Sequence, residues 1–153
     1  MNSLKRILLV LLAGSVLLFP GCGGSGSDDP SDNTPSVAEE QARVTGMMKS
    51  GTWKLQALSV DGVDQTAAFS GLTVSFTDNT FTSINGRDVW PNIGTWTFDP
   101  GQAATFTRND KTSVSIDAIT STDLTLSLNW SVTKLGPGRS QSIKGKNVFK
   151  FVH

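Results

Sequence analysis

The sequence of 153 residues has few of the residues on which active sites and disulfide frameworks usually depend. It has one cysteine, which excludes an internal disulfide, and it has no tyrosine. Its one histidine, His153, is the last residue, and chain termini are usually mobile. A serine or cysteine nucleophile thus has no histidine base in the body of the chain, and zinc has no ligand cluster. We expect no enzymatic activity, no cofactor and no metal site.

An excess of charge of one sign is also missing, because 13 Lys and Arg balance 13 Asp and Glu. Residues 22–44 carry five acids and one base, whereas residues 45–153 carry ten bases and eight acids. A nearly neutral domain without a clustered basic face gives no indication of nucleic-acid binding. Asp61 and Asp64 lack the spaced oxygens and closing glutamate of a calcium loop, so a solvated turn fits them better.

The longest apolar run is short. Lys5 and Arg6 precede 13 almost wholly apolar residues, Ile7 to Phe19, and a spanning helix needs about 20. A basic start, an apolar segment and a small residue before the cut predict a signal peptide over residues 1–21. Leu18-Phe19-Pro20-Gly21-Cys22 resembles a bacterial lipobox, in which the cysteine receives a diacylglyceryl group. An ordinary secretory signal with an incidental free cysteine is the alternative.

Cys22 is therefore the expected lipidation site. Two or three acyl chains, such as palmitate, hold a protein stably on a membrane, whereas one chain does not. Residues 22–35 are rich in Gly, Ser, Asp and Pro, which predicts a flexible acidic tether. Ser27-Asp28-Asp29 resembles an export signal of Gram-negative surface lipoproteins, and Gly23 lacks the aspartate associated with inner-membrane retention. We expect an outer-membrane, cell-surface location; a plain solvated spacer is the alternative reading of these residues.

A short helix follows the tether. Ser36-Val37-Ala38-Glu39 has the spacing of a capping box, and the apolar positions 37, 44, 47 and 48 fall on one face. The pattern predicts a helix over residues 36–49 that packs against something larger.

From Gly51 onward, apolar and polar residues alternate with a period of two. Residues 124–132 show this most clearly, and Val114, Ile116 and Ala118 are predicted to share one face. The pattern predicts eight strands, at residues 52–59, 72–77, 80–84, 94–99, 103–107, 112–119, 122–133 and 142–152. Sequential antiparallel strands with one polar side favour an up-and-down barrel, because closure removes exposed edges. We assign residues 50–153 to an all-β, eight-stranded antiparallel barrel preceded by the short N-terminal helix.

The connections predict two unlike ends. Tight turns lie at residues 78–79, 100–102 and 120–121, whereas 60–71, 85–93 and 134–141 are long and 108–111 is short. Because alternate loops of a meander lie at opposite ends, one end is closed by turns and the other is rimmed by long loops.

Gly51-Thr52-Trp53 opens the first strand after the helix, as the Gly-x-Trp motif does in lipocalins, and Gly94-Thr95-Trp96 repeats it. With the lipobox, residues 46–153 resemble the lipocalin-like domains of Gram-negative, Bacteroidota-type surface lipoproteins. The chain is shorter than a classical lipocalin and lacks the disulfide and the middle Thr-Asp-Tyr motif of that family. The resemblance implies that Gly51 and Trp53 close the narrow end of the barrel, with Lys146 or Lys150 over the indole ring.

An eight-stranded barrel is either filled by its own side chains or holds one small ligand. For a ligand site we look to the loop end, where Phe69, Arg87, Trp90 and Arg139 are available. Trp90, before Pro91 on a polar loop, is predicted to be an exposed indole that receives a sugar ring or an apolar ligand. An anchor tucked back onto the barrel is the alternative for Trp90.

The sequence thus predicts a lipid-anchored outer-membrane lipoprotein whose lipocalin-like barrel binds a small apolar or amphipathic ligand, or a glycan. The alternative is a structural or accessory envelope lipoprotein with a filled barrel that contacts a protein partner. A connected interior cavity of about 300 Å³ or more would favour the ligand.

Overall fold

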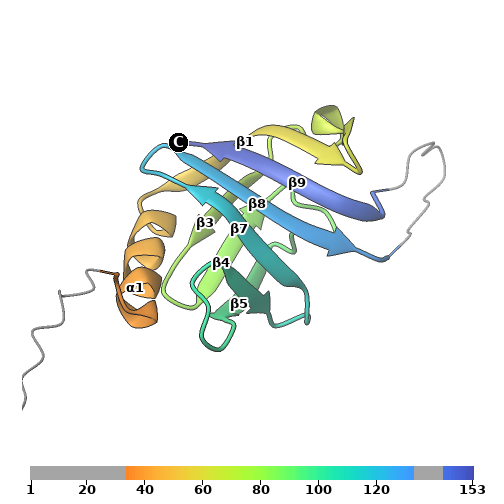
Figure 1. Ribbon diagram of the computed structural model, residues 1–153. Helices are drawn as coiled ribbons and strands as arrows, with labels where there is room; N and C mark the ends of the chain where they lie inside the picture. The colour runs from red at the N-terminus through yellow and green to blue at the C-terminus, as the bar shows by residue number, and fades with distance from the viewer. Residues whose placement is uncertain (1–33, 133–142) are drawn as a thin grey trace, which may run out of the picture. The chain divides into compact units, whose positions relative to one another are not determined.

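The computed structural model describes residues 34–132 and 143–153 (Figure 1). The predicted signal peptide, the predicted lipidation site Cys22, most of the predicted tether and Arg139 lie outside these residues. Within the described ranges, no helix is long and apolar enough to cross a membrane.

The chain begins with helix α1 (Val37–Met48), as the capping pattern predicts. The Ser36 hydroxyl accepts from the Glu39 backbone N–H at 3.3 Å, and the Glu39 carboxylate accepts from the Ser36 N–H at 2.8 Å. The Glu39 carboxylate accepts from the Ser36 hydroxyl at 2.8 Å as well as from the Ser36 N–H, and these two bonds hold the pKa of Glu39 below its usual value. Val44 and Met48 are the buried residues of the helix, so α1 packs one face on the barrel.

Eight strands form the barrel: β1 (Thr52–Val60), β3 (Thr73–Phe76), β4 (Thr80–Ile84), β5 (Ile93–Phe98), β6 (Thr105–Arg108), β7 (Ser113–Ile119), β8 (Asp123–Trp130) and β9 (Gly145–Val152). Each strand pairs antiparallel with the next, and β9 returns to pair with β1. The predicted eight-stranded up-and-down barrel is confirmed. The predicted long connection 60–71 contains the short strand β2 (Val63–Asp64), which pairs only with β1, and the 3₁₀ turn η1 (Thr66–Phe69).

Two β-bulges change which side chains point inward. In β7 the register shifts between Ile116 and Ala118, so Ala118 is exposed and Ile119 packs on the core. The prediction that Ala118 shares the inner face is wrong, because the extra residue of a bulge reverses the alternation after it. A similar shift after Leu55 in β1 brings Leu58 to the inside.

Large side chains fill the barrel. Those with 0% exposure include Trp53, Phe81, Val89, Trp90, Phe106, Val114, Leu126 and Phe149. At zero exposure, no space large enough for a water molecule touches these side chains. The rings meet mainly edge to face, as Trp90 and Phe81 do with centroids 5.5 Å apart. The interior around these residues is a packed core and not a ligand chamber.

Candidate functional site

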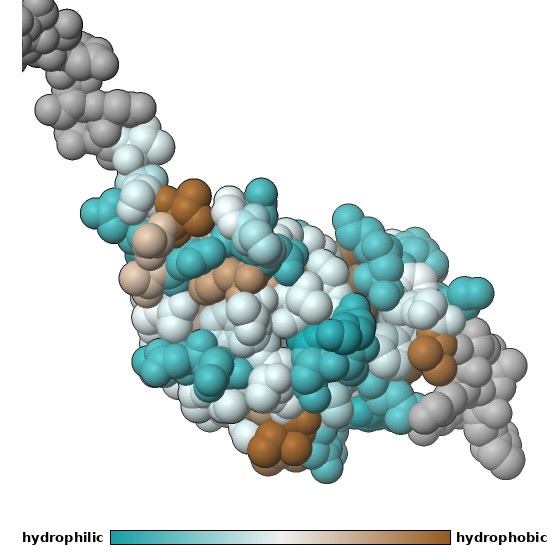
Figure 2. Space-filling model, turned by 90° about the horizontal axis from the view of Figure 1, so that it is seen from below, coloured by the Kyte–Doolittle hydropathy of each residue, from teal (hydrophilic) through white to brown (hydrophobic). Residues whose placement is uncertain are grey.

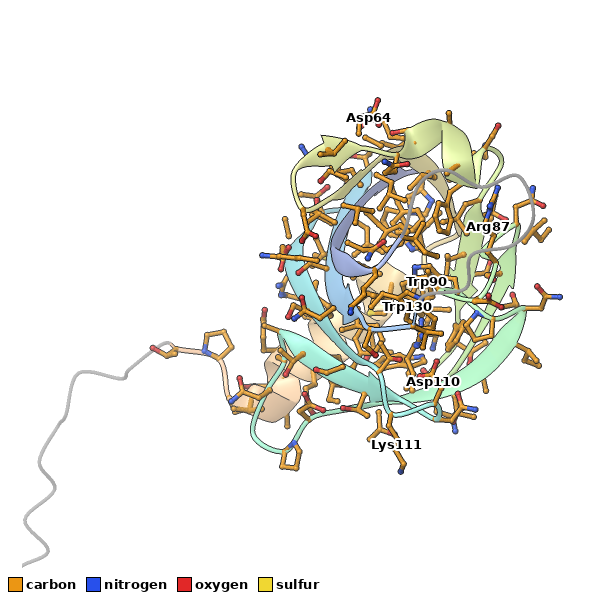
Figure 3. The ribbon with its side chains drawn as sticks, turned by 90° about the vertical axis from the view of Figure 1, so that its right-hand side faces the viewer. Asp64, Arg87, Trp90, Asp110, Lys111 and Trp130 are labelled. Atoms are coloured by element: carbon orange, nitrogen blue, oxygen red, sulfur yellow. The ribbon has the colours of Figure 1, made fainter. Side chains whose placement is uncertain are left out.

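The connections divide between the two ends of the barrel as the strand order predicts, although their lengths overlap. The connections 77–79, 99–104 and 120–122 lie at the end that α1 covers, and the predicted long connection 134–141 lies outside the described residues. At the end that α1 covers, Gln41 Nε2 donates to the carbonyl of Gln102 at 2.6 Å, and Lys49 pairs with Asp78. The connections 61–72, 85–92 and 109–112 lie at the opposite end, which we call the loop end. Figure 3 looks onto it.

Trp90, the predicted exposed platform, is fully buried inside the loop end. Its ring packs on Phe81 and, 6.0 Å away, on Phe149. Its backbone N–H donates to Gly86 at 2.9 Å, and a Cβ on Gly86 would lie 2.1 Å from the Trp90 carbonyl oxygen. The glycine thus permits a tight turn that directs the indole inward. The prediction of an exposed indole is therefore wrong, and the alternative reading of Trp90, an anchor tucked back onto the barrel, is confirmed. Residues 85–92 form what we call the plug loop.

Arg108 packs against the plug loop, although the sequence interpretation did not single it out. The side chain is buried, and its Nη1 donates to the carbonyl of Val89 at 2.7 Å. Its guanidinium lies 4.9 Å from the centre of the Trp90 ring and 5.7 Å from that of Phe81, within cation–π range. A signal was present: Arg108 comes two residues after the inward Phe106, so alternation alone directs it inside.

Asp110 supplies the counter-charge to Arg108. Its two oxygens accept from Arg108 at 2.6 and 3.2 Å, and Oδ1 also accepts from the Thr112 backbone N–H at 3.0 Å. Partial burial raises the pKa of Asp110, but the hydrogen bonds from Arg108 and Thr112 and the Arg108 charge outweigh it, so the pKa lies below the ordinary 3.8. Asp110 is therefore ionised at neutral pH and balances the buried cation.

Two buried polar atoms of the described core have no hydrogen-bond partner: Trp90 Nε1 and Asn147 Oδ1. Asn147 donates with its amide nitrogen to the carbonyls of Ile143 and Gly145, so only its oxygen is unpaired. Each unpaired buried group costs about 1–3 kcal/mol. One of these costs falls on the plug loop, at Trp90, and the other on β9, at Asn147.

The structure brings two other predicted site residues together. Arg87 is exposed, and its guanidinium carbon lies 5.5 Å from the centre of the Phe69 ring. Phe69 itself is buried, so the expectation that it is available to a ligand is wrong. The hollow beside Arg87 measures about 160 Å³, which is below the range of ordinary ligand sites. Arg139 lies outside the described residues.

A larger hollow of about 600 Å³ lies at the loop end, along the outer side of β7 and β8. We call it the β7–β8 groove. Six hydroxyl or amide side chains line it: Thr112, Ser113, Ser115, Ser127, Asn129 and Ser131. Its charged residues are Asp110, Lys111, Asp117 and Lys146, and its apolar residues are Leu128, Trp130 and Val132. In Figure 3, Trp130, Asp110 and Lys111 follow one another from the centre of the barrel outward.

At the opposite end, Trp53 is buried and its Nε1 donates to the carbonyl of Met48 at 2.9 Å. This bond joins β1 to the last turn of α1. The ring over Trp53 belongs to His153, with centroids 3.9 Å apart, and not to Lys146 or Lys150. Both lysines are exposed on the outer face of β9, so the expectation of a lysine over this indole is wrong.

Gly51 fits against the same histidine, because a Cβ at this position would lie 2.9 Å from the His153 ring. The ring also makes a 2.7 Å hydrogen bond with the hydroxyl of Ser50. The same hydroxyl donates to the carbonyl of Met47 at 2.6 Å, so Ser50 links the C-terminal histidine to the end of α1. Within residues 34–132 and 143–153, no group of three His, Cys, Asp or Glu is placed to hold a metal ion.

A closed antiparallel barrel with a helix over one end and long connections at the other defines a lipocalin-like protein. A family model described as a lipocalin-like domain matches residues 50–128, from the Gly51-Thr52-Trp53 motif into β8. The chain belongs to this family. No curated protein and no solved structure matches the chain significantly. The lipocalin-like barrel indicates ligand binding in general and names no ligand.

Proposed function

We propose that the protein is a non-enzymatic, lipid-anchored outer-membrane lipoprotein, displayed at the cell surface, whose barrel binds a small amphipathic ligand or a glycan at its loop end. The family supports the binding role, and the lipobox around Cys22 supports the anchor. Thr34 lies twelve positions after Cys22, and a fully extended chain spans about 40 Å over that number of steps. Such a tether lets the barrel stand clear of a membrane.

The β7–β8 groove is the observation that carries this proposal. It has the volume of a ligand site, whereas the side chains inside the barrel leave no comparable space among them. A ligand of this protein is therefore taken up at the rim and outer side of the loop end. This differs from a barrel that encloses its ligand, and it directs the search to polar compounds.

A contact with an envelope protein is the second candidate, favoured by the filled interior and by two exposed isoleucines. Ile84 on β4 and Ile93 on β5 are 65% and 71% exposed, and their strands are neighbours. The face shown in Figure 2 is mostly polar, with apolar residues in small separate patches.

Native mass spectrometry tests the two candidates. The full chain is purified in mild detergent from the membranes of its own host. A retained small molecule supports ligand binding, and a co-purified protein on a ligand-free barrel supports the second candidate.

A further inference from the structure

The β7–β8 groove exists because neighbouring strands differ in length. The last residue of β8 that pairs with β7 is Leu128, opposite Val114, but β8 runs on to Trp130 and there pairs only with β9. On the side of β7, the chain has already turned through residues 109–112. The end of β8 therefore stands beside a gap. Short side chains, such as the facing Ser115 and Ser127, leave the gap open.

The groove has no dense cluster of charge of one sign. Asp110 is already paired with Arg108, and the other charged residues of the lining are Asp117, Lys111 and Lys146, so the lining is not built for a strongly charged ligand. Only three of the lining side chains are apolar, and one of them, Leu128, is nearly buried. An acyl chain would leave the polar lining unpaired, at a cost for each group. The ligand that fits is uncharged and polar.

The lining also offers both hydrogen-bond donors and hydrogen-bond acceptors. Hydroxyl groups donate and accept, the lysines only donate, and an ionised carboxylate only accepts. Asp117 Oδ1 accepts from the Ser127 hydroxyl at 3.0 Å, which leaves most of its acceptor sites open to the groove. Trp130, half-buried at the inner end, adds an aromatic surface. A sugar has many hydroxyl groups and an apolar C–H face, so it matches a lining that combines hydrogen-bonding side chains with an aromatic surface.

We propose that the β7–β8 groove is a site for an oligosaccharide, in which Trp130, at the rim of the barrel, stacks on one sugar ring and Asp117, on the outer face of β7, accepts from the hydroxyls of another. The proposal rests on the proposed ligand binding at the loop end and names its ligand class. It moves the site from Trp90 and Arg87, where the sequence placed it, to the rim of the barrel at Trp130 and the outer side of β7 and β8.

Binding is measured by isothermal titration calorimetry on the full chain in detergent. The probes are oligosaccharides of glucose, mannose, galactose and N-acetylglucosamine, with oleate as the apolar comparison. We expect at least one oligosaccharide to bind and to change the tryptophan fluorescence. Asp117→Asn should weaken that binding about tenfold or more, because a charged acceptor is lost. Asp99→Asn is the matched control, since Asp99 accepts from the Thr107 hydroxyl in the same way but lies outside the groove.

A second pair of variants tests the space itself. Ser115→Phe fills the groove and should abolish oligosaccharide binding, whereas Ser75→Phe, on the outer face of β3, should leave it unchanged. Thermal melting checks that all four variants fold. Binding of oleate alone would overturn the carbohydrate site but leave the proposed ligand binding intact. If no probe binds, both proposals fail. Oligosaccharide binding that is equally strong in Asp117→Asn and Ser115→Phe places the site elsewhere and overturns the inference.

Discussion

The charged guanidinium of Arg108 is buried in an aromatic core, where it makes an ion pair, a hydrogen bond and two cation–π contacts. Its partners are the carboxylate of Asp110, the carbonyl of Val89 and the faces of Trp90 and Phe81. A buried charge is costly to leave unpaired, so each partner that is lost destabilises the fold more than the contact alone suggests. Arg108 therefore links three elements, β6, the plug loop and the turn at Asp110.

Asp110→Asn should make the free energy of unfolding depend less on pH in the acid range. A carboxyl whose pKa is lower in the folded protein stabilises the fold above its unfolded pKa, and this contribution is lost as the pH falls through the folded pKa. We expect wild type to be more stable than the variant at neutral pH and the difference to shrink below about pH 4. Urea unfolding of both proteins from pH 7 to pH 3 measures this. A difference that stays constant over the range would show that Asp110 acts without its charge.

Trp90→Ala should destabilise the protein by about 3–5 kcal/mol, the usual range for deleting a large buried aromatic. Arg87→Ala, three residues earlier on the same loop, should cost less than about 1 kcal/mol, because Arg87 is exposed and only stacks on Phe69. Chemical denaturation of both variants provides the comparison. Equal and small losses would mean that the plug loop does not pack as described.

At the level of single residues, the sequence predicts a side chain's direction or role correctly where residues adjacent in the chain determine it. The inward direction of Phe106 and the capping of α1 by Ser36 are of this kind. Trp90 was misplaced because its direction depends on the tight turn from Gly86 to Trp90 and on tertiary contacts of the indole with Phe149 and Arg108. No pattern along the plug loop distinguishes an indole that turns inward from one that faces solvent.

Among the elements, the strands were predicted within a few residues, because one wet face imposes the same alternation on each of them. The alternation fails where a bulge inserts a residue, as at Asp117 in β7. The same bulge places Asp117 beside Ser127, where it lines the β7–β8 groove.

Two glycines test the plug loop and helix α1 as elements. Gly86→Ala should destabilise the barrel, because the new Cβ would lie 2.1 Å from the Trp90 carbonyl oxygen and displace the loop. Gly46→Ala in α1 should stabilise it by about 0.5–1 kcal/mol, since nothing lies within 4 Å of the new Cβ and alanine favours a helix. The two melting temperatures should move in opposite directions. A shift in the same direction for both would contradict either the plug loop or the open face of α1.

For the molecule as a whole, the closure of the barrel could be predicted from local sequence patterns. The structures at its two ends, a closing helix contact and a groove, could not. Strand number and alternation predicted the closed sheet, and strand order assigned the connections to the two ends. Trp53 ties α1 over the turn end through the carbonyl of Met48, so the helix closes that end of the barrel. The groove at the other end depends on how far β8 runs past β7, a property of register that no single strand shows.

The attachment of the whole protein rests on Cys22, and Cys22→Ala tests it. The described residues contain no helix that is long and apolar enough to cross a membrane, and the lipobox predicts that Cys22 carries the acyl chains. Without acyl chains the protein loses the only membrane attachment that we propose, because stable anchoring needs two or three acyl chains. We expect the variant to move from the membrane fraction to the soluble fraction with its fold intact. Ser25→Ala, in the same tether, should stay with the membrane. Full retention of Cys22→Ala in washed outer membranes would show that something other than lipid holds the protein there.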